Sequence, residues 1–151
     1  MRGTIVCGVA ETEEGRAAAE LAGALGERLG LRLVLVSVLD GIPAGTHESV
    51  TARQRQVGAD RMLRRLAGEA GHGAETRVVL GERAEALAEV AAEEGADLIV
   101  VGSRAGRLGN RKLRCALAGE LEAATPVPVV VAPPATRRRS ANRLAASAAA
   151  R

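Results

Sequence analysis

The segment from residue 102 to 116 contains residue types that bind phosphate groups. Five cations follow one another in it, with no acidic residue between Asp97 and Glu120: Arg104, Arg107, Arg111, Lys112 and Arg114. Gly106 and Gly109 lie among them, and glycine lets backbone N–H groups approach an anion closely. Arg104, Gly106, Arg107, Gly109 and Arg111 are therefore candidate anion-binding residues. A solvated basic loop that leads into a helix, or a protein-contact surface, would have the same composition.

The rest of the chain has no pattern of a known catalytic centre. It has no serine, histidine and carboxylate set, no HExxH, no GxGxxG after the first apolar segment and no P-loop lysine motif. The stretch 102–106 resembles a serine nucleophile turn only loosely, because its third residue is Arg104. We expect no catalytic residue and classify the chain as a non-enzyme.

The cysteines and histidines give no metal site. Cys7 and Cys115 lie far apart and match neither metal-ligand nor redox spacing, so we expect small buried side chains. His47 and His72 stand in polar surroundings without a second ligand near them. We expect both histidines to lie in loops without a role.

Composition limits the classes of partner. The 151 residues include no Phe, Tyr or Trp, so no base can stack on an aromatic ring, and we expect no nucleic-acid partner. Five of the 21 basic residues lie in the segment 135–151, which has no acid and is rich in Ala, Arg and Ser, so we expect it to be a disordered tail. The alternative is weak, salt-sensitive contact of these arginines with an acidic partner, nucleic acid or anionic lipid. No apolar stretch is long enough to cross a membrane and no signal pattern precedes the first strand, so we expect a cytoplasmic protein without a membrane partner.

The apolar periodicity predicts alternating strands and helices. Continuous β-branched runs are typical of buried strands, and spacings of three and four are typical of helices. The predicted strands cover 4–9, 32–38, 75–80, 97–101 and 127–131, and the helices cover about 13–29, 48–70, 82–94 and 112–124. The spacing assigns Leu29 to the inner face of the first helix and Val57 to that of the second.

This alternation predicts a doubly wound α/β fold with an open parallel sheet, because parallel strands need helical crossovers. In such sheets ligands bind beyond the carboxyl ends of the strands, where the winding direction reverses. The loops after the first and fourth strands therefore matter most.

Three separated segments resemble the universal stress protein family: 81–87 (GERAEAL), 94–104 (EGADLIVVGSR) and 125–131 (TPVPVVV). They match in order and at the family's spacing, and the resemblance covers residues 3–134, so we expect one universal stress protein domain at 1–134. The resemblance implies a sheet in the order 3-2-1-4-5, similar to the adenine nucleotide alpha hydrolases, with the switch point between strands one and four.

The resemblance also implies positions for a nucleotide. The ATP-binding branch of the family has Gly, two residues, Gly, nine residues, Gly and then Ser or Thr after strand four. These positions are Gly102, Ala105, Cys115 and Ala116 here, so three of the four differ. The family's Asp at the end of strand one is Ala10, which follows Val9, whereas the adenine-packing valine of strand two is kept as Val38.

These differences predict weak nucleotide binding. A Cβ at position 105 or a thiol-bearing side chain at 115 narrows the backbone approach to phosphate, and position 116 loses a hydroxyl donor. A hydrogen bond to a charged group contributes about 1.5–3 kcal/mol. Two or three such losses would weaken binding by about 10² to 10⁴.

The function expected from the resemblance is a non-enzymatic stress-response role with little or no ATP binding and no bound cofactor. The alternatives are a module that binds ATP, AMP or another phosphorylated ligand through the arginine-rich loop and, less favoured, a slow nucleotide hydrolase. The last strand, 127–131, would be an apolar edge, which the family commonly pairs across a two-fold axis. We therefore expect a homodimer, alongside a protein partner that the sequence does not identify.

Overall fold

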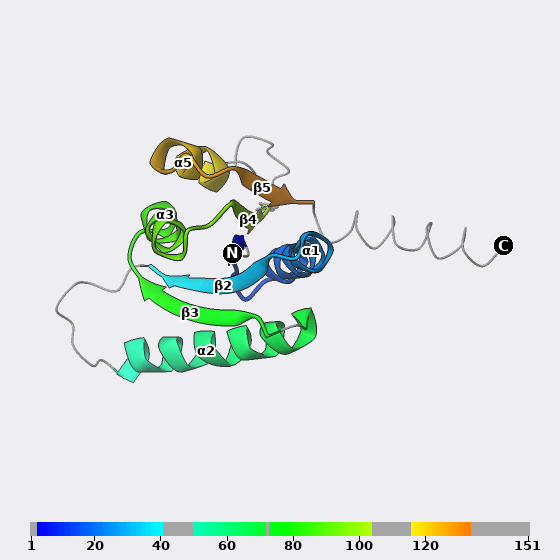
Figure 1. Cartoon of the computed structure of the whole chain (residues 1–151). Helices are drawn as coiled ribbons and strands as arrows, with labels where there is room; N and C mark the ends of the chain where they lie inside the picture. The colour runs from blue at the N-terminus through cyan, green and yellow to red at the C-terminus, as the bar shows by residue number, and fades with distance from the viewer. Residues whose placement is uncertain (1–2, 41–49, 72, 104–115, 134–151) are drawn as a thin grey trace.

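The computed structural model describes residues 3–40, 50–71, 73–103 and 116–133 (Figure 1). The tail predicted at 135–151, the two histidines and Cys115 lie outside these residues. The described strands are β1 (Thr4–Gly8), β2 (Arg32–Leu39), β3 (Glu75–Leu80), β4 (Leu98–Gly102) and β5 (Val129–Ala132). The described helices are α1 (Glu13–Leu29), α2 (Val50–Ala70), α3 (Arg83–Glu94) and α5 (Ala116–Ala124).

The five strands form one parallel sheet, as the alternation predicted, in the order β3-β2-β1-β4-β5 that the resemblance implied. Helices α1 and α2 cover one face of the sheet, and α3 and α5 cover the other (Figure 1). The chain winds from β1 toward β3 in one direction and from β1 toward β5 in the other. The winding therefore reverses between β1 and β4, which pair in the register Cys7 to Val100.

The core is aliphatic on both faces of the sheet. Successive residues of a strand point to opposite faces, so Ile5 packs with α1 and α2 while Val6 packs with α3 and α5. Leu35 and Leu63 fill the first layer, and both are fully buried. Each such side chain contributes about 1.5–3 kcal/mol on burial, so a core without aromatic rings is sufficient for this fold.

The helix ends follow the sequence signals. Thr12 caps α1 by accepting from the Gly15 amide at 3.1 Å, and Gly30 ends the helix at φ 68°. Glu82 caps α3 with its carboxylate, which accepts from the amides of Ala84 and Glu85. The third predicted helix therefore begins one residue later than expected, because Glu82 is the cap.

Three sequence expectations need correction. Leu29 is 61% exposed and Val57 is 53% exposed, so neither belongs to an inner helix face. Met62 and Leu66, which the same spacing predicts for the inner face, do cover the sheet, on the opposite side of α2 from Val57. Strand β5 begins at Val129 and not at residue 127, because Pro128 has no N–H to give to the ladder, although its carbonyl accepts from Ile99 at 2.9 Å.

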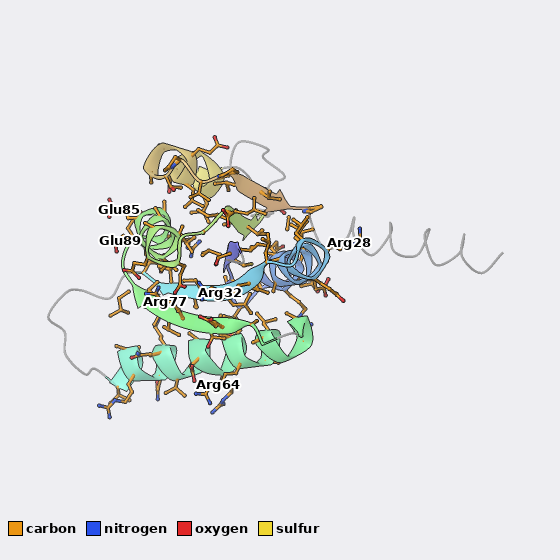
Figure 2. The ribbon with its side chains drawn as sticks, viewed as in Figure 1. Arg28, Arg32, Arg64, Arg77, Glu85 and Glu89 are labelled. Atoms are coloured by element: carbon orange, nitrogen blue, oxygen red, sulfur yellow. The ribbon has the colours of Figure 1, made fainter. Side chains whose placement is uncertain are left out.

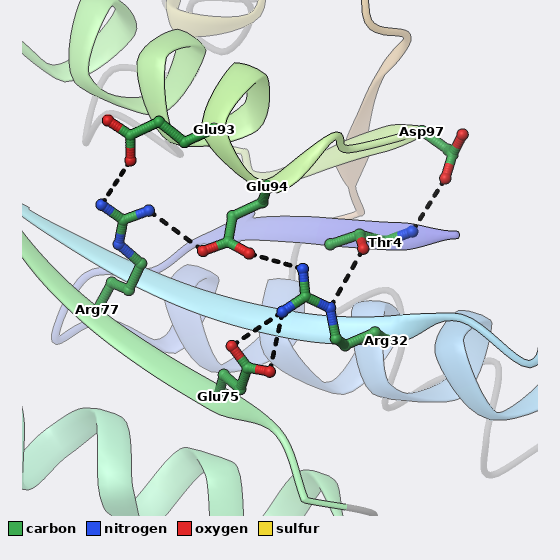
Figure 3. Close-up of polar contacts among 7 residues, drawn as sticks. All are labelled: Thr4, Arg32, Glu75, Arg77, Glu93, Glu94 and Asp97. Atoms are coloured by element: carbon green, nitrogen blue, oxygen red, sulfur yellow. Dashed lines mark hydrogen bonds and ion pairs between the residues drawn. The ribbon is translucent and has the colours of Figure 1, made fainter. Parts of the chain in front are cut away.

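The amino ends of the strands are held by an ion-pair network (Figure 3). Arg32 bridges Glu75 at 2.9 Å and Glu94 at 2.6 Å, and Arg77 reaches Glu94 at 3.2 Å. Asp97 precedes β4 and accepts from the Thr4 amide at 2.9 Å, which explains why β4 starts one residue later than predicted. The network ties β1, β2, β3 and α3 together at the end of the sheet opposite to the switch-point loops.

No helix in the described ranges is long and apolar enough to cross a membrane.

Candidate functional site

A cavity of about 820 Å³ lies at the carboxyl ends of β1, β2 and β4, where the winding reverses. We call it the switch-point cavity. Its apolar wall consists of Val9, Val36, Val38, Leu39, Met62, Leu87, Val101 and Leu117, and its polar lining includes Glu11, Thr12, Glu14, Asp40, Arg55, Arg83 and Ser103. The sequence predicted this position, because residues 9–12 directly after β1 and Ser103 directly after β4 border the cavity.

Ala10 lies at the mouth of the cavity with an exposed side chain. Its carbonyl oxygen accepts from the Thr12 amide at 2.8 Å, and a Cβ on Gly15 would collide with that carbonyl. The turn after β1 is thus packed directly onto the first turn of α1. The side chain of Ala10 is a methyl group, so this side chain offers no acceptor to a ligand.

Val9 directly follows β1, and Val38 lies near the end of β2. Val9 is buried, and its amide donates to the Val36 carbonyl at 2.9 Å, which extends the pairing of β1 and β2 by one residue. Val38 is half-buried near the end of β2 and packs against the layer under α3. Both valines line the cavity and give it an apolar wall.

Gly102 has a packing role. A Cβ at this position would lie 2.6 Å from the carbonyl oxygen of Glu14 and 2.9 Å from its carbonyl carbon. The end of β4 therefore approaches the first turn of α1 at a distance that only glycine permits. This contact accounts for glycine at position 102 without any ligand.

Ser103 was not singled out from the sequence as a site residue. It follows β4, is 5% exposed and lines the cavity, and its hydroxyl has no hydrogen-bond partner among the described residues. A buried polar group without a partner costs about 1–3 kcal/mol. Ser37 on β2 is also buried and also lines the cavity, so sequence alone gives no signal that separates the two serines.

A charged group closes the cavity at the end of β2. Asp40 lies 3.7 Å from Arg55 of α2 and 3.6 Å from Arg83 of α3, and Arg55 also donates to the Asp40 carbonyl at 3.0 Å. The residue after β2 is thus connected to one helix from each face of the sheet. Spacing along the chain could not predict this group, because its three members come from three separate elements.

The charges on the described lining do not favour a polyphosphate. Glu11, Glu14 and Asp40 bring three carboxylates against the two guanidinium groups of Arg55 and Arg83. Both arginines already pair with Asp40. Glu14 also lies in the first turn of α1, where a carboxylate uses the positive helix end that a phosphate would otherwise occupy.

Other predicted site residues divide into two groups. Ala116 begins α5 with an exposed methyl group and no hydroxyl, as the sequence states. Seven predicted positions lie outside the described residues: Arg104, Ala105, Gly106, Arg107, Gly109, Arg111 and Cys115. Their approach to the cavity stays a prediction.

Cys7 lies in the core and takes no part in the site. It is fully buried in the layer under α1 and α2, and burial raises the pKa of its thiol far above the usual value. The protonated thiol behaves as a small apolar side chain, as expected from the sequence. Within the described ranges, no three His, Cys, Asp or Glu side chains come together in a group that could hold a metal ion.

A sequence profile described as "Universal stress protein family" matches residues 1–133. The chain belongs to the universal stress protein family. The resemblance carried by 81–87, 94–104 and 125–131 is thereby confirmed. No curated protein matches the sequence significantly.

Solved structures of universal stress proteins have the same fold. One from Burkholderia pseudomallei is 24% identical, with a TM-score of 0.69 over 87% of this chain and 96% of that one. A universal stress protein in complex with cAMP is 20% identical, with a TM-score of 0.70 over 87% and 97% of the two chains. The Archaeoglobus fulgidus protein in complex with dAMP is 16% identical, with a TM-score of 0.65 over 88% and 98%. At these identities the likeness establishes the fold.

Proposed function

We propose that this universal stress protein acts in the stress response without catalysing a reaction, and that its switch-point cavity binds ATP weakly or not at all. The observation that carries the proposal is the pair of methyl groups at Ala10 and Ala116. They stand where the ATP-binding branch of the family has a carboxylate and a hydroxyl. A cytoplasmic location, as expected from the sequence, is part of the proposal.

The cavity itself is present, and what it lacks are polar side chains that would bind the phosphates of ATP. The apolar wall formed by Val9 and Val38 is present, and the cavity has about 820 Å³. The three carboxylates on its lining would repel the negative charges of a triphosphate. Apolar contact alone would hold adenine weakly and would leave the phosphates without partners.

A direct test uses the absence of aromatic residues. A chain without Phe, Tyr or Trp absorbs almost no near-ultraviolet light, so any nucleotide that co-purifies would dominate the absorbance spectrum. We expect the purified protein to show no adenine band. A stoichiometric adenine band would contradict the proposal.

One observation favours a second candidate function, the binding of a nucleotide or another phosphorylated ligand. The Ser103 hydroxyl is buried, has no described partner and lines the cavity, so it could donate to a ligand oxygen. Two structurally similar proteins were solved with cAMP and dAMP, each a monophosphate of adenosine or deoxyadenosine. A monophosphate carries less charge than ATP and would be repelled less by Glu11 and Glu14.

The proposal includes a homodimer that pairs β5 with its symmetry mate. Strand β5 is one edge of the sheet, and Val129, Val130 and Val131 are only half-buried in the single chain. An apolar edge strand invites pairing with another chain. The nitrogen of Pro128 faces β4, so its missing N–H leaves the outward donors of Val129 and Val131 available for that pairing.

A further inference from the structure

Helix α2 has a basic outer face that the cavity does not use. Ala59, Met62, Leu63 and Leu66 pack toward the sheet. The opposite side of the helix exposes Val57, Arg61, Arg64, Arg65 and Gly68, which we call the basic α2 face. Arg64 projects outward from this face (Figure 2). Arg64 pairs with Asp60 at 3.0 Å, whereas no ion pair in the described part of the chain involves Arg61 or Arg65.

The other described helices are acidic. Helix α2 contains five arginines against two carboxylates, whereas α3 contains one arginine against four glutamates. Glu85 and Glu89 lie on the exposed side of α3, with Ala92 one turn further along (Figure 2). We call Glu85, Glu89 and Ala92 the acidic α3 face. The molecule therefore presents opposite charges on two separate helices.

The two faces match in spacing. Arg61 and Arg65 are four residues apart on α2, and Glu85 and Glu89 are four residues apart on α3, so each pair spans about one helical turn of 5.4 Å. Small residues, Gly68 on one helix and Ala92 on the other, would let the two backbones approach closely. Within one molecule the faces cannot meet, because α2 and α3 lie on opposite faces of the sheet (Figure 1).

We propose that the basic α2 face binds the acidic α3 face of a second copy of this chain. Arg61 and Arg65 of one copy would pair with Glu85 and Glu89 of the next. Because the contacting surfaces differ, the association is head-to-tail and can add further copies. It leaves β5 free for the proposed dimer, since α2 packs on β3 at the opposite edge of the sheet, and none of the four charged residues lines the switch-point cavity.

The charge distribution favours a second copy over a nucleic acid. Helix α1 lies beside α2 on the same face of the sheet and contains four glutamates against two arginines, so a polyanion long enough to extend beyond the basic α2 face would be repelled there. The chain has no aromatic residue on which a base could stack. A second copy fits the basic α2 face, because its acidic α3 face has the opposite charge. Its own basic α2 face lies on another side of the molecule and does not oppose the contact.

The test is a charge-swap experiment on the full-length chain, read by sedimentation velocity over a range of protein concentrations. One variant carries Arg61→Glu and Arg65→Glu, and the other carries Glu85→Arg and Glu89→Arg. All four side chains are exposed, so both variants should fold, which circular dichroism and thermal melting check. A third variant, Arg16→Glu with Arg28→Glu on α1, changes the net charge by the same amount as the first variant but away from both faces.

At about 0.01 M salt, where the Debye length is about 30 Å, we expect the sedimentation coefficient of the wild type to rise with protein concentration. At about 1 M salt, where the Debye length is about 3 Å, the sedimentation coefficient should not rise. Each swapped variant alone should lose this rise, because like charges then face each other. An equimolar mixture of the two should regain it, since each variant complements the other. The α1 variant should behave as the wild type.

Several outcomes would overturn the proposal. The first is an absence of concentration dependence in the wild type at low salt, and the second is a mixture that stays as small as its components. A third is loss of association in the Glu85 and Glu89 variant only, which would mean that another cationic segment binds α3. A fourth is retention of a DNA duplex by the wild type, lost on changing Arg61 and Arg65, in a protein that does not self-associate.

Discussion

The carbonyl oxygen of Glu14 lies 2.6 Å from the position that a Cβ on Gly102 would occupy. The first turn of α1 thus packs against the end of β4 with no room for a side chain. Gly102 is the one position of the four-residue loop motif that agrees with the ATP-binding branch. Its packing role means that this agreement is not evidence for a bound nucleotide.

Gly102→Ala should therefore destabilise the protein in the absence of any ligand. Backbone atoms must shift to admit the methyl group, and overpacking of this kind costs about 1–3 kcal/mol. Gly119→Ala is the matched control, because a Cβ there would meet nothing within 4 Å on helix α5. That change should raise stability by up to about 1 kcal/mol. Urea unfolding followed by circular dichroism measures both, and equal effects would contradict the packing role.

Ser103→Ala should leave the ligand-free protein equally stable or more stable by about 1 kcal/mol, because it removes a buried hydroxyl that has no described partner. The same unfolding measurement applies. A loss of stability greater than about 1 kcal/mol would show that the hydroxyl already has a partner. If a monophosphate is found to bind, its affinity should fall in this variant.

Glu94 should make folding stability dependent on acid pH. The hydrogen bond from Arg32 is the main reason that the pKa of Glu94 lies below its usual value, with a further contribution from Arg77. As pH falls, the unfolded chain binds a proton at this residue before the folded chain does, so the stabilisation is present above the usual pKa and is lost as pH falls through the lowered one. We expect Glu94→Gln to lose about 1 kcal/mol at neutral pH, and less at low pH.

The control for this pH dependence is Glu120→Gln, an exposed residue of α5. Its stability profile should follow that of the wild type from neutral to acid pH. Identical acid profiles for the wild type and Glu94→Gln would show that Glu94, in the network of Figure 3, contributes no pH-dependent stability.

Val131→Pro should separate the proposed dimer without unfolding the edge of the sheet. Ile99 pairs with Val129 and donates to the Pro128 carbonyl, so in a parallel ladder the amides of 129 and 131 point away from β4. Proline at 131 would remove an outward donor only. Light scattering at tens of micromolar should show a dimer for the wild type and a monomer for the variant, at a salt concentration high enough to suppress ion pairs. A monomeric wild type would contradict the dimer.

Much of the fold could be predicted from the sequence because its signals are local. The β-branched runs give the five strands, and Thr12, Gly30 and Gly95 mark helix ends by capping and by positive φ. Leu29 and Val57 were assigned to inner faces wrongly, since periodicity gives the spacing of apolar residues but not which of them the neighbouring elements cover. The edge position of β5 followed from the family resemblance.

The candidate site was predicted only in part. Val9 and Ala10 follow strand one, where the switch-point rule places a ligand, and Val38 was implied by the family resemblance; all three border the cavity. The group formed by Asp40, Arg55 and Arg83 depends on how helices from both faces meet one strand end, which no spacing along the chain specifies. The packing of Gly102 on Glu14 likewise needs tertiary distances.

Titration calorimetry with ATP tests the central claim most directly. It compares the wild type with a variant that restores the motif: Ala10→Asp, Ala105→Gly, Cys115→Gly and Ala116→Ser. Moderate salt suppresses non-specific attraction of ATP to arginines. Circular dichroism checks that the variant is folded, because each new glycine can lower stability by about 1 kcal/mol where it stands in a helix. We predict no measurable heat of binding for the wild type and measurable affinity for the variant. Low-micromolar binding of ATP by the wild type would contradict the account.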